Sequence, residues 1–259
     1  MIHMISLTLT DVNLFALVFT RVGGMLFFNP LLNRKNIPTQ FRIAFALGLA
    51  LLIMPNIPSS TVSGIAGFGL VFAIIKELFT GICFGVLFQI YYYLLFVAGD
   101  IIDMGFGLSM AKAFDPSTNI QTSLTGSFFQ LVFIVYFFVT DCHLIFVKLI
   151  ISTFGLVGIG GMNFGADIGS FICAQFVSAF GLIMHLAIPF IAASFILEIG
   201  MGVLMKLIPQ INVFSIHFQF KILLGLSLLF LFAVPVTEFI QTYINEIFVQ
   251  MQNLIGIIK

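Results

Sequence analysis

The segment IAGFGLVFAIIKELFTGICFGVLFQIYYYLLFVA, Ile65–Ala98, is apolar along almost its whole length, and its only charged residues are Lys76 and Glu77. A helix needs roughly 20 residues, at about 1.5 Å of rise each, to cross a bilayer. The apolar residues do not alternate with polar ones in the period of two that is typical of barrel strands. The segment therefore predicts a long membrane helix that tilts, bends or extends beyond the bilayer.

The rest of the chain has the same apolar character. Hydrophobic residues make up 61% of its 259 residues and charged residues only 8%, and the mean hydropathy is +1.20. Soluble domains carry about a quarter charged residues, and only structures that pair their own backbone groups span hydrocarbon. We therefore predict an all-α integral membrane protein of about six long, partly bent helices. The apolar segments are Val12–Phe28, Ile43–Ile57, Ile65–Ala98, Leu124–Ser152, Gly169–Met205 and Ile222–Val236.

Several function classes are excluded by charge and residue pattern. The formal net charge is zero, so the sequence offers no basic surface for nucleic acid. Cysteines and histidines are scattered and lack the spacing of metal ligands, and neither a phosphate-binding loop nor a catalytic set is present. We therefore expect no enzymatic activity, no cofactor and no metal site.

The basic residues outside the apolar segments predict the orientation. Cytoplasmic loops of membrane proteins carry an excess of Lys and Arg. With six spans, the basic loops and turns fall on one side, which is then the cytoplasm, and both termini lie outside it. These residues are Arg34, Lys35, Arg42, Lys112, Lys206 and Lys221.

The C-terminal segment predicts an amphipathic helix, because its apolar residues recur at helical spacing and its amides take the other face. Two interpretations stay open. The apolar face lies either in the membrane interface or against a partner subunit. The apolar residues are Ile240, Ile244, Ile247, Met251, Leu254 and Ile258.

Charged residues within the apolar segments must be paired, because a lone charge at membrane depth costs at least about 2.5 kcal/mol. Arg21 lies well inside the first predicted span, and Asp100 or Asp103 is the partner we expect for it. We interpret Glu198 with Lys206 as a half-buried pair rather than a proton relay. The candidates for buried charge pairing are Arg21, Lys76, Glu77, Asp100, Asp103 and Glu198.

The stretch Gly99–Ser123 separates two strongly apolar segments and contains GFGLSMAKAFDP, Gly105–Pro116. A loop at membrane depth is tolerated only where it is buried in protein or lines a cavity. Glycine gives the backbone freedom, while Met and Phe provide deformable apolar surfaces. Two interpretations remain: a packed structural loop, or a plug that seals a passage and then yields.

Motifs along nearly the whole chain resemble those of the FliR family, flagellar biosynthesis proteins of the type III export gate. The most specific motif is GDIIDMGFGLSMAKAFDP, Gly99–Pro116, and no single motif would be decisive alone. The order and spacing of the whole set carry the resemblance. The other motifs are Arg21 with Pro30, Asn36–Arg42, Lys76–Gly85, Asp141–His143, and Ile208–Phe214 with Lys221.

The resemblance implies a non-enzymatic subunit of the bacterial inner membrane, within the flagellar basal body. Its partners would be FliP-like and FliQ-like subunits, an FlhB-like protein, the basal-body ring, membrane lipid and the unfolded flagellar proteins that are exported. An alternative is the corresponding subunit of an injectisome. A secondary transporter of small solutes is a more distant alternative, because the sequence contains no internal repeat.

The resemblance also implies two parts and two sites. Residues 1–165 would form a FliP-like helical part with the plug loop, and residues 166–259 a FliQ-like hairpin with the C-terminal amphipathic helix. The plug would comprise Met104, Gly105, Phe106, Gly107, Leu108, Ser109, Met110, Phe114, Asp115 and Pro116. The contact with a cytoplasmic partner would comprise Lys206, Pro209, Gln210 and Lys221.

Overall fold

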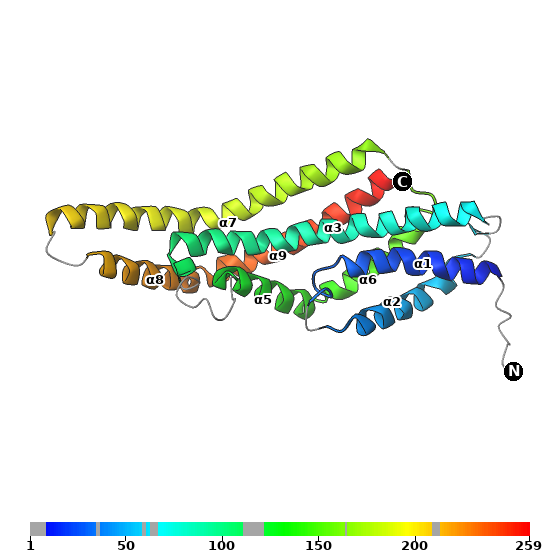
Figure 1. Ribbon diagram of the computed structural model, residues 1–259, viewed down its shortest axis with the longest axis horizontal. Coiled ribbons are helices and arrows are strands. Elements are labelled where there is room, and N and C mark those ends of the chain that lie inside the picture. Colours follow the sequence, from blue (N-terminus) through cyan, green and yellow to red (C-terminus); the bar gives the residue numbers. More distant parts are fainter. Residues whose placement is uncertain are drawn as a thin grey trace. The chain divides into compact units, whose positions relative to one another are not determined.

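The computed structural model describes residues 9–34, 37–58, 61–62, 67–110, 122–163, 165–208 and 213–259, and within them every regular element is a helix (Figure 1). The predicted all-α fold is confirmed for this part of the chain. The elements are α1 (Leu9–Phe27), α2 (Thr39–Ile53), η1 (Met54–Asn56), α3 (Phe68–Gly105), η3 (Leu108–Met110), α5 (Leu124–Val139), α6 (Cys142–Leu156), α7 (Ala166–Leu207), α8 (Val213–Leu231) and α9 (Ala233–Ile258).

In the part of the chain that the structure describes, four stretches of helix are long and apolar enough to cross a membrane: Leu9–Phe27, Thr39–Asn56, Phe68–Gly105 and Asp167–Leu207. Two bent helix pairs raise the number to as many as six, which agrees with the six apolar segments of the sequence. The first pair is α5 with α6, which bend by 73° at their junction, and the second is α8 with α9, which bend by 62°.

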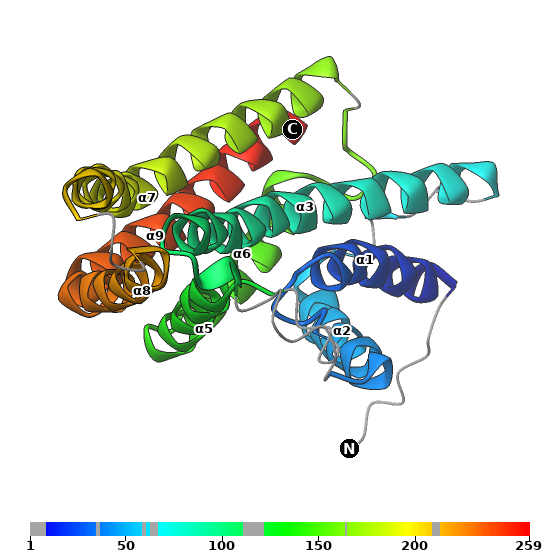
Figure 2. The same cartoon turned by 60° about the vertical axis from the view of Figure 1, so that its left-hand side comes forward.

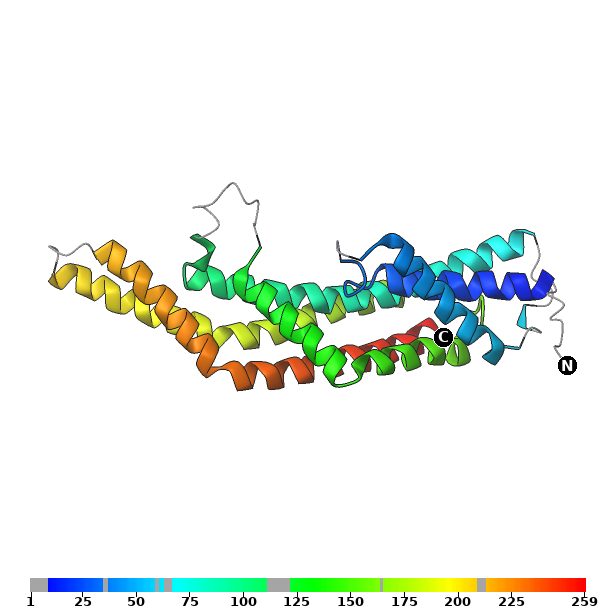
Figure 3. The ribbon, with the colours of Figure 1, turned by 90° about the horizontal axis from the view of Figure 1, so that it is seen from below.

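Each bend has a local cause in the sequence. At the first, Thr140 ends α5 and Asp141 adopts the left-handed conformation, with φ of 57°. This conformation is uncommon for residues with a side chain and does not continue a helix. At the second, Pro235 has no backbone N–H to donate and its ring crowds the carbonyl of Leu231. Figure 3 shows the resulting angle between α8 and α9.

The chain folds into two compact units. The first unit comprises Met1–Ile90, Asp141–Gln175 and Ile247–Lys259. Within it α1 and α2 lie side by side (Figure 2). The α1 helix also runs along α3, and the two meet at glycines: a Cβ atom built on Gly24 would lie 3.0 Å from the Cα of Gly81. Such close approach of backbones is typical of small residues at helix contacts in membranes.

The second unit comprises Tyr91–Thr140 and Phe176–Glu246. Here α3 crosses α5 with backbone against backbone, because a Cβ atom on Gly99 would overlap the backbone of Gly126. The hydroxyl of Tyr243 donates to the carbonyl of Tyr91 at 2.9 Å and joins α9 to α3. The described part of α8 lies beside α7 as a hairpin (Figures 1 and 3).

Helix α9 corrects the interpretation of the C-terminal segment. The apolar residues that were expected to face lipid or a partner are buried within the chain itself, so neither alternative holds for this face. They are Ile240, Ile244, Ile247, Met251, Leu254 and Ile258. The end of the helix is also fixed, since the amide of Asn163 donates to the carbonyl of Ile258 at 3.4 Å.

Candidate functional site

The first unit contains a fully buried ion pair between α1 and α3. The side chain of Arg21 is 0% exposed and that of Glu77 only 1%. Both oxygens of the Glu77 carboxylate accept from the guanidinium, Oε2 from Nε and Oε1 from Nη2 at 2.8 Å. This two-bond geometry is the strongest that arginine and carboxylate form. It offsets the cost of placing both charges away from water.

The remaining donors of Arg21 cap the end of α6. Nη1 donates to the carbonyls of Thr153 and Val157 at 3.0 and 3.1 Å, and Nη2 donates to that of Gly158 at 3.4 Å. The guanidinium carbon also lies 4.4 Å from the ring centroid of Phe154. The last carbonyls of a helix have no partner within the helix and carry partial negative charge. Arg21 therefore supplies a donor to the carbonyl of Val157, and a second donor to those of Thr153 and Gly158, which already accept from backbone amides.

The loop that follows α6 is held by the same cluster. The amide of Gly160 donates to Oε1 of Glu77 at 2.8 Å, and its carbonyl accepts from Nζ of Lys76 at 3.2 Å. Gly160 has φ of 70°, a conformation that glycine adopts without strain. The three charged residues Arg21, Lys76 and Glu77 thus lie together and fasten this loop to α1 and α3.

The partner of Arg21 corrects the sequence-based expectation, which named Asp100 or Asp103. Residue numbers rise together along the contact of α1 with α3, since Gly24 meets Gly81 and Gly85 meets Phe28. The helices therefore run parallel, and Glu77, one turn before Gly81, comes level with Arg21. The glycine contact sets this register, and the sequence pattern alone did not reveal it.

Asp103 is buried, but its partners in the described part of the chain are not cations. Its Oδ2 accepts from the hydroxyl of Ser123 at 2.6 Å and from the amide of Thr125 at 3.2 Å. Its Oδ1 accepts from the hydroxyl of Thr125. The positive end of the α5 dipole and these donors stabilise the carboxylate, so Asp103 joins α3 to the start of α5.

Glu198 also departs from the expectation of a buried pair with Lys206. Its carboxylate accepts from Nζ of Lys221 at 2.6 Å, and the side chains are 44% and 14% exposed, respectively. This pair links α7 to α8. Lys206 is exposed in the last turn of α7, and Asp100 is half-buried in α3. The other predicted contact residues, Pro209 and Gln210, lie outside the described residues.

The described half of the predicted plug motif packs on the hairpin of α7 and α8. A Cβ atom on Gly105 would lie 3.2 Å from the hydroxyl oxygen of Ser194 in α7. Phe106 is fully buried, and a Cβ atom on Gly225 in α8 would lie 2.7 Å from its Cγ. Met104, in contrast, is 64% exposed.

Gly107 turns the chain with φ of 72°. It lies against Phe218 and Lys221 of α8, so a residue of the predicted plug contacts a residue of the predicted cytoplasmic partner site. Leu108, Ser109 and Met110 form η3. Phe114, Asp115 and Pro116 lie outside the described residues. Sequence reasoning missed Gly225, Ser123 and Thr125. A serine directly before an apolar run was the available signal, because it marks a helix N-terminus.

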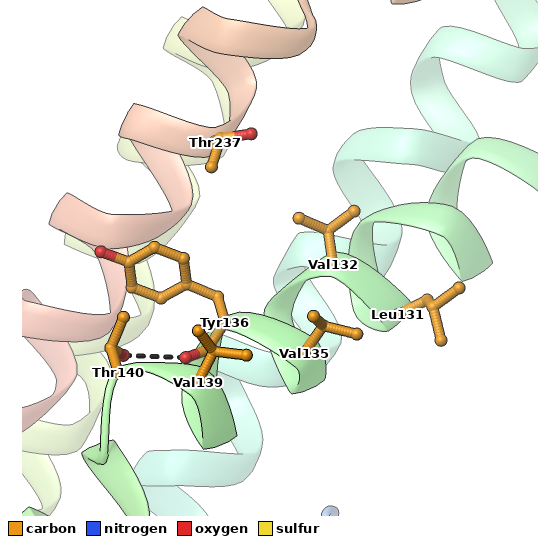
Figure 4. Close-up of a pocket in the computed structure, with 7 residues that line it drawn as sticks. All are labelled: Leu131, Val132, Val135, Tyr136, Val139, Thr140 and Thr237. Carbon is orange, nitrogen blue, oxygen red and sulfur yellow. Dashed lines mark hydrogen bonds between the residues drawn. The ribbon is translucent and has the colours of Figure 1, made fainter.

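An apolar pocket of about 270 Å³ lies in the second unit, between α5 and Thr237 of α9 (Figure 4). Its two threonine hydroxyls are occupied: Thr140 donates to the carbonyl of Tyr136 at 2.8 Å, and Thr237 donates to that of Ala233 at 2.8 Å. No titratable acid, base or thiol is among its lining residues apart from the phenol of Tyr136. Among the described residues, no group of three or more His, Cys, Asp or Glu side chains is placed to hold a metal ion.

Comparison with known proteins gives a match over nearly the whole chain: residues 12–247 fit the family described as bacterial export proteins, family 1. The chain belongs to this family. The match to the export family includes most of α1, all of α3 and slightly more than half of α9, and hence the Arg21–Glu77 pair and the residues around Asp103.

Similar members of the export family are named flagellar biosynthetic protein FliR. The protein of that name from Bacillus subtilis (strain 168) is 25% identical over 94% of this chain and 95% of its own length. The protein from Escherichia coli (strain K12) is 25% identical over 96% of this chain and 95% of its own length. The one from Caulobacter vibrioides is 28% identical over 83% of this chain and 86% of its own length.

Proposed function

We propose that this chain is a non-enzymatic subunit of the flagellar type III export gate in the bacterial inner membrane. The observation that carries the proposal is the match of residues 12–247 to a family of export proteins. Relatives that cover this chain almost end to end are named for flagellar biosynthesis, which favours a flagellum over an injectisome.

The surface of the chain supports assembly with FliP-like and FliQ-like subunits. In the most apolar part of α7, only 28% of the residues are buried within the chain. In the stretch Thr39–Asn56, which contains α2, only 22% are buried. Large apolar side chains stand exposed along both units, among them Phe68 and Phe230. Such surfaces need lipid or apolar protein as neighbours. Partner subunits would cover part of this area, and the basal-body ring would surround the assembly.

The proposed division into a FliP-like part, residues 1–165, and a FliQ-like part, residues 166–259, follows the order of the helices along the chain. It differs from the two compact units, each of which contains residues of both parts. The boundary falls between residue 165 and α7, immediately before the hairpin of α7 and α8. Under this division, the Arg21 cluster belongs to the FliP-like part. The ion pair of Glu198 with Lys221 belongs to the FliQ-like part.

The proposed gate comprises Met104–Met110 and Phe114–Pro116. The exposed side chain of Met104 and the turn at Gly107 support it. Met and Phe side chains would seal a narrow passage by dispersion contacts and rearrange when an unfolded flagellar protein arrives. The cytoplasmic end would include Lys206, Pro209, Gln210 and Lys221, where an FlhB-like protein would bind, and both termini would lie outside the cytoplasm.

Co-purification tests the proposal directly. The tagged chain is expressed with and without the FliP-like and FliQ-like proteins of its own genome, and native mass spectrometry in mild detergent gives the particle mass. One assembly that contains all three proteins supports the proposal. A stable monomer or homo-oligomer that ignores both partners would overturn it, and solute transport by that monomer in liposomes would then favour a transporter.

A further inference from the structure

The end of α3 contacts two different helices of the second unit through residues three positions apart. Asp103 binds the first turn of α5, and Phe106 packs on the middle of α8. Both side chains are buried, whereas Met104 between them is exposed. The first residues of the motif that includes the proposed gate therefore differ. Asp103 and Phe106 are held by their contacts, and the side chain of Met104 is exposed.

We propose that Asp103 and Phe106 are positioning residues that hold the start of the gate motif, and that neither belongs to the sealing surface. The inference rests on the proposed gate function of Met104–Pro116. It assigns separate tasks to neighbouring residues: Asp103 and Phe106 fix the backbone, while the exposed side chain of Met104 is left to contribute to the surface that meets the passage.

The hydrogen bonds of Asp103 indicate a structural role, because they connect the end of α3 to the start of α5. Ser123 donates its hydroxyl to Asp103, and its Oγ also accepts from the amide of Gly126 at 2.9 Å, so one serine caps α5 and binds α3. The close crossing at Gly99 and Gly126 brings the backbones near enough for these short side chains to reach. Loss of the carboxylate leaves buried donors without an acceptor.

The contact of Phe106 with Gly225 depends on size. A Cβ atom at position 225 would lie 2.7 Å from Cγ, 2.9 Å from Cβ and 3.1 Å from Cδ1 of Phe106. These distances are too short for any side chain to be added without displacement of the ring. Glycine in the interior of a helix is unfavourable on its own. Its presence in α8 is explained by the ring that fills the space.

A size exchange tests the Phe106 contact. Gly225→Val forces Phe106 out of its position, and we expect it to lower the yield of assembled complex about tenfold. The double variant Gly225→Val with Phe106→Ala lacks the clash. Its yield should come within about threefold of the yield of the single variant Phe106→Ala. Gly181→Val in α7 is the matched control, because a Cβ built there meets no described atom within 4 Å outside its own stretch of helix. No rescue in the double variant would overturn the contact.

Ion leak per assembled complex separates positioning from plain stability. In complexes that still assemble, Phe106→Ala and Asp103→Leu should raise membrane conductance, because the gate surface loses its fixed start. Asp103→Asn keeps an acceptor oxygen and should restore low conductance. Normal conductance per complex in both Phe106→Ala and Asp103→Leu would overturn the positioning role.

The outcome also separates this inference from the proposed function. If the wild-type chain fails to assemble with FliP-like and FliQ-like proteins, the proposed function fails. The membrane level of the single chain then still reports the Phe106–Gly225 exchange. Rescue there supports the contact, and its absence overturns it.

Discussion

Nη1 of Arg21 in α1 donates to the carbonyl of Val157, the C-cap residue of α6, across 136 positions of sequence. The same guanidinium is paired with Glu77 of α3. One side chain thus joins three helices of the first unit. A lone arginine would be costly at membrane depth, and here each of its donor nitrogens has an acceptor within the chain.

Arg21→Ala should destabilise the chain by about 3–5 kcal/mol, because it leaves the carboxylate of Glu77 buried without its counter-ion. We expect a low yield of assembled complex but normal transport by each gate that does assemble. Arg21→Lys should restore only part of the yield, since an ammonium cannot make the paired bonds of a guanidinium. Complex yield in detergent measures the effect, with exposed Lys148→Ala as control. A normal yield for Arg21→Ala would refute the prediction.

Gly81→Ala should loosen the contact of α1 with α3. Its Cβ atom would lie 2.9 Å from the Cα of Gly24 and 3.0 Å from the amide nitrogen of Met25. Overpacking of this kind costs about 1–3 kcal/mol. Gly48→Ala in α2 meets nothing within 4 Å and should leave the chain unchanged or slightly more stable. Thermal unfolding of the purified complex compares the two, and equal midpoints would contradict the proposed close contact.

Ser123→Ala should lower stability by about 1 kcal/mol or more, because it removes the N-terminal cap of α5. It also removes one donor to Asp103. Ser127→Ala, one turn later in the same helix, is the control. Ser127 is an exposed residue, and its hydroxyl donates to the backbone carbonyl of Ser123 at 2.6 Å. The urea concentration at which the complex dissociates gives the comparison. If both variants behave alike, the cap has no special role.

Met110→Ala combined with Phe114→Ala should leave assembly intact and make the gate leak ions. Smaller side chains would lose the dispersion contacts that seal the passage. Conductance across membranes that contain the assembled complex measures the leak. Unchanged conductance in a fully assembled variant would count against the plug.

The helices could be predicted because lipid imposes long apolar runs, and the part of the run Ile65–Ala98 that begins at Phe68 lies in one helix of 38 residues, Phe68–Gly105. The bend within Leu124–Ser152 was not predicted. Apolar character continues on both sides of Thr140, and hydropathy does not register a single residue in the left-handed conformation. In the sequence, the bend is marked only by the two polar residues Thr140 and Asp141.

The candidate site shows where sequence reasoning stops. The need of Arg21 for an acidic partner follows from its depth in an apolar segment, but the choice of Glu77 depends on the register of two helices. That register comes from a glycine contact between α1 and α3. The spacing of Gly81 and Gly85 favours close helix contact, but it does not identify the helix that makes the contact. From the sequence, Phe106 was predicted to be a gate residue because its side chain is large and apolar. Its burial against Gly225 favours a positioning role, and the sequence does not contain this information.

The Arg21 cluster also constrains the order in which the protein can be made. Glu77 follows Arg21 by 56 residues and Gly158 follows it by 137. At about 5–20 residues per second, the last acceptor emerges from the ribosome roughly 7–27 s after the guanidinium. Until Glu77 has been made, the guanidinium of Arg21 has no counter-ion, and until the end of α6 has been made, its remaining donors lack their carbonyl acceptors. The newborn chain therefore depends on the insertion machinery, or on a waiting partner subunit, until α6 has been synthesised.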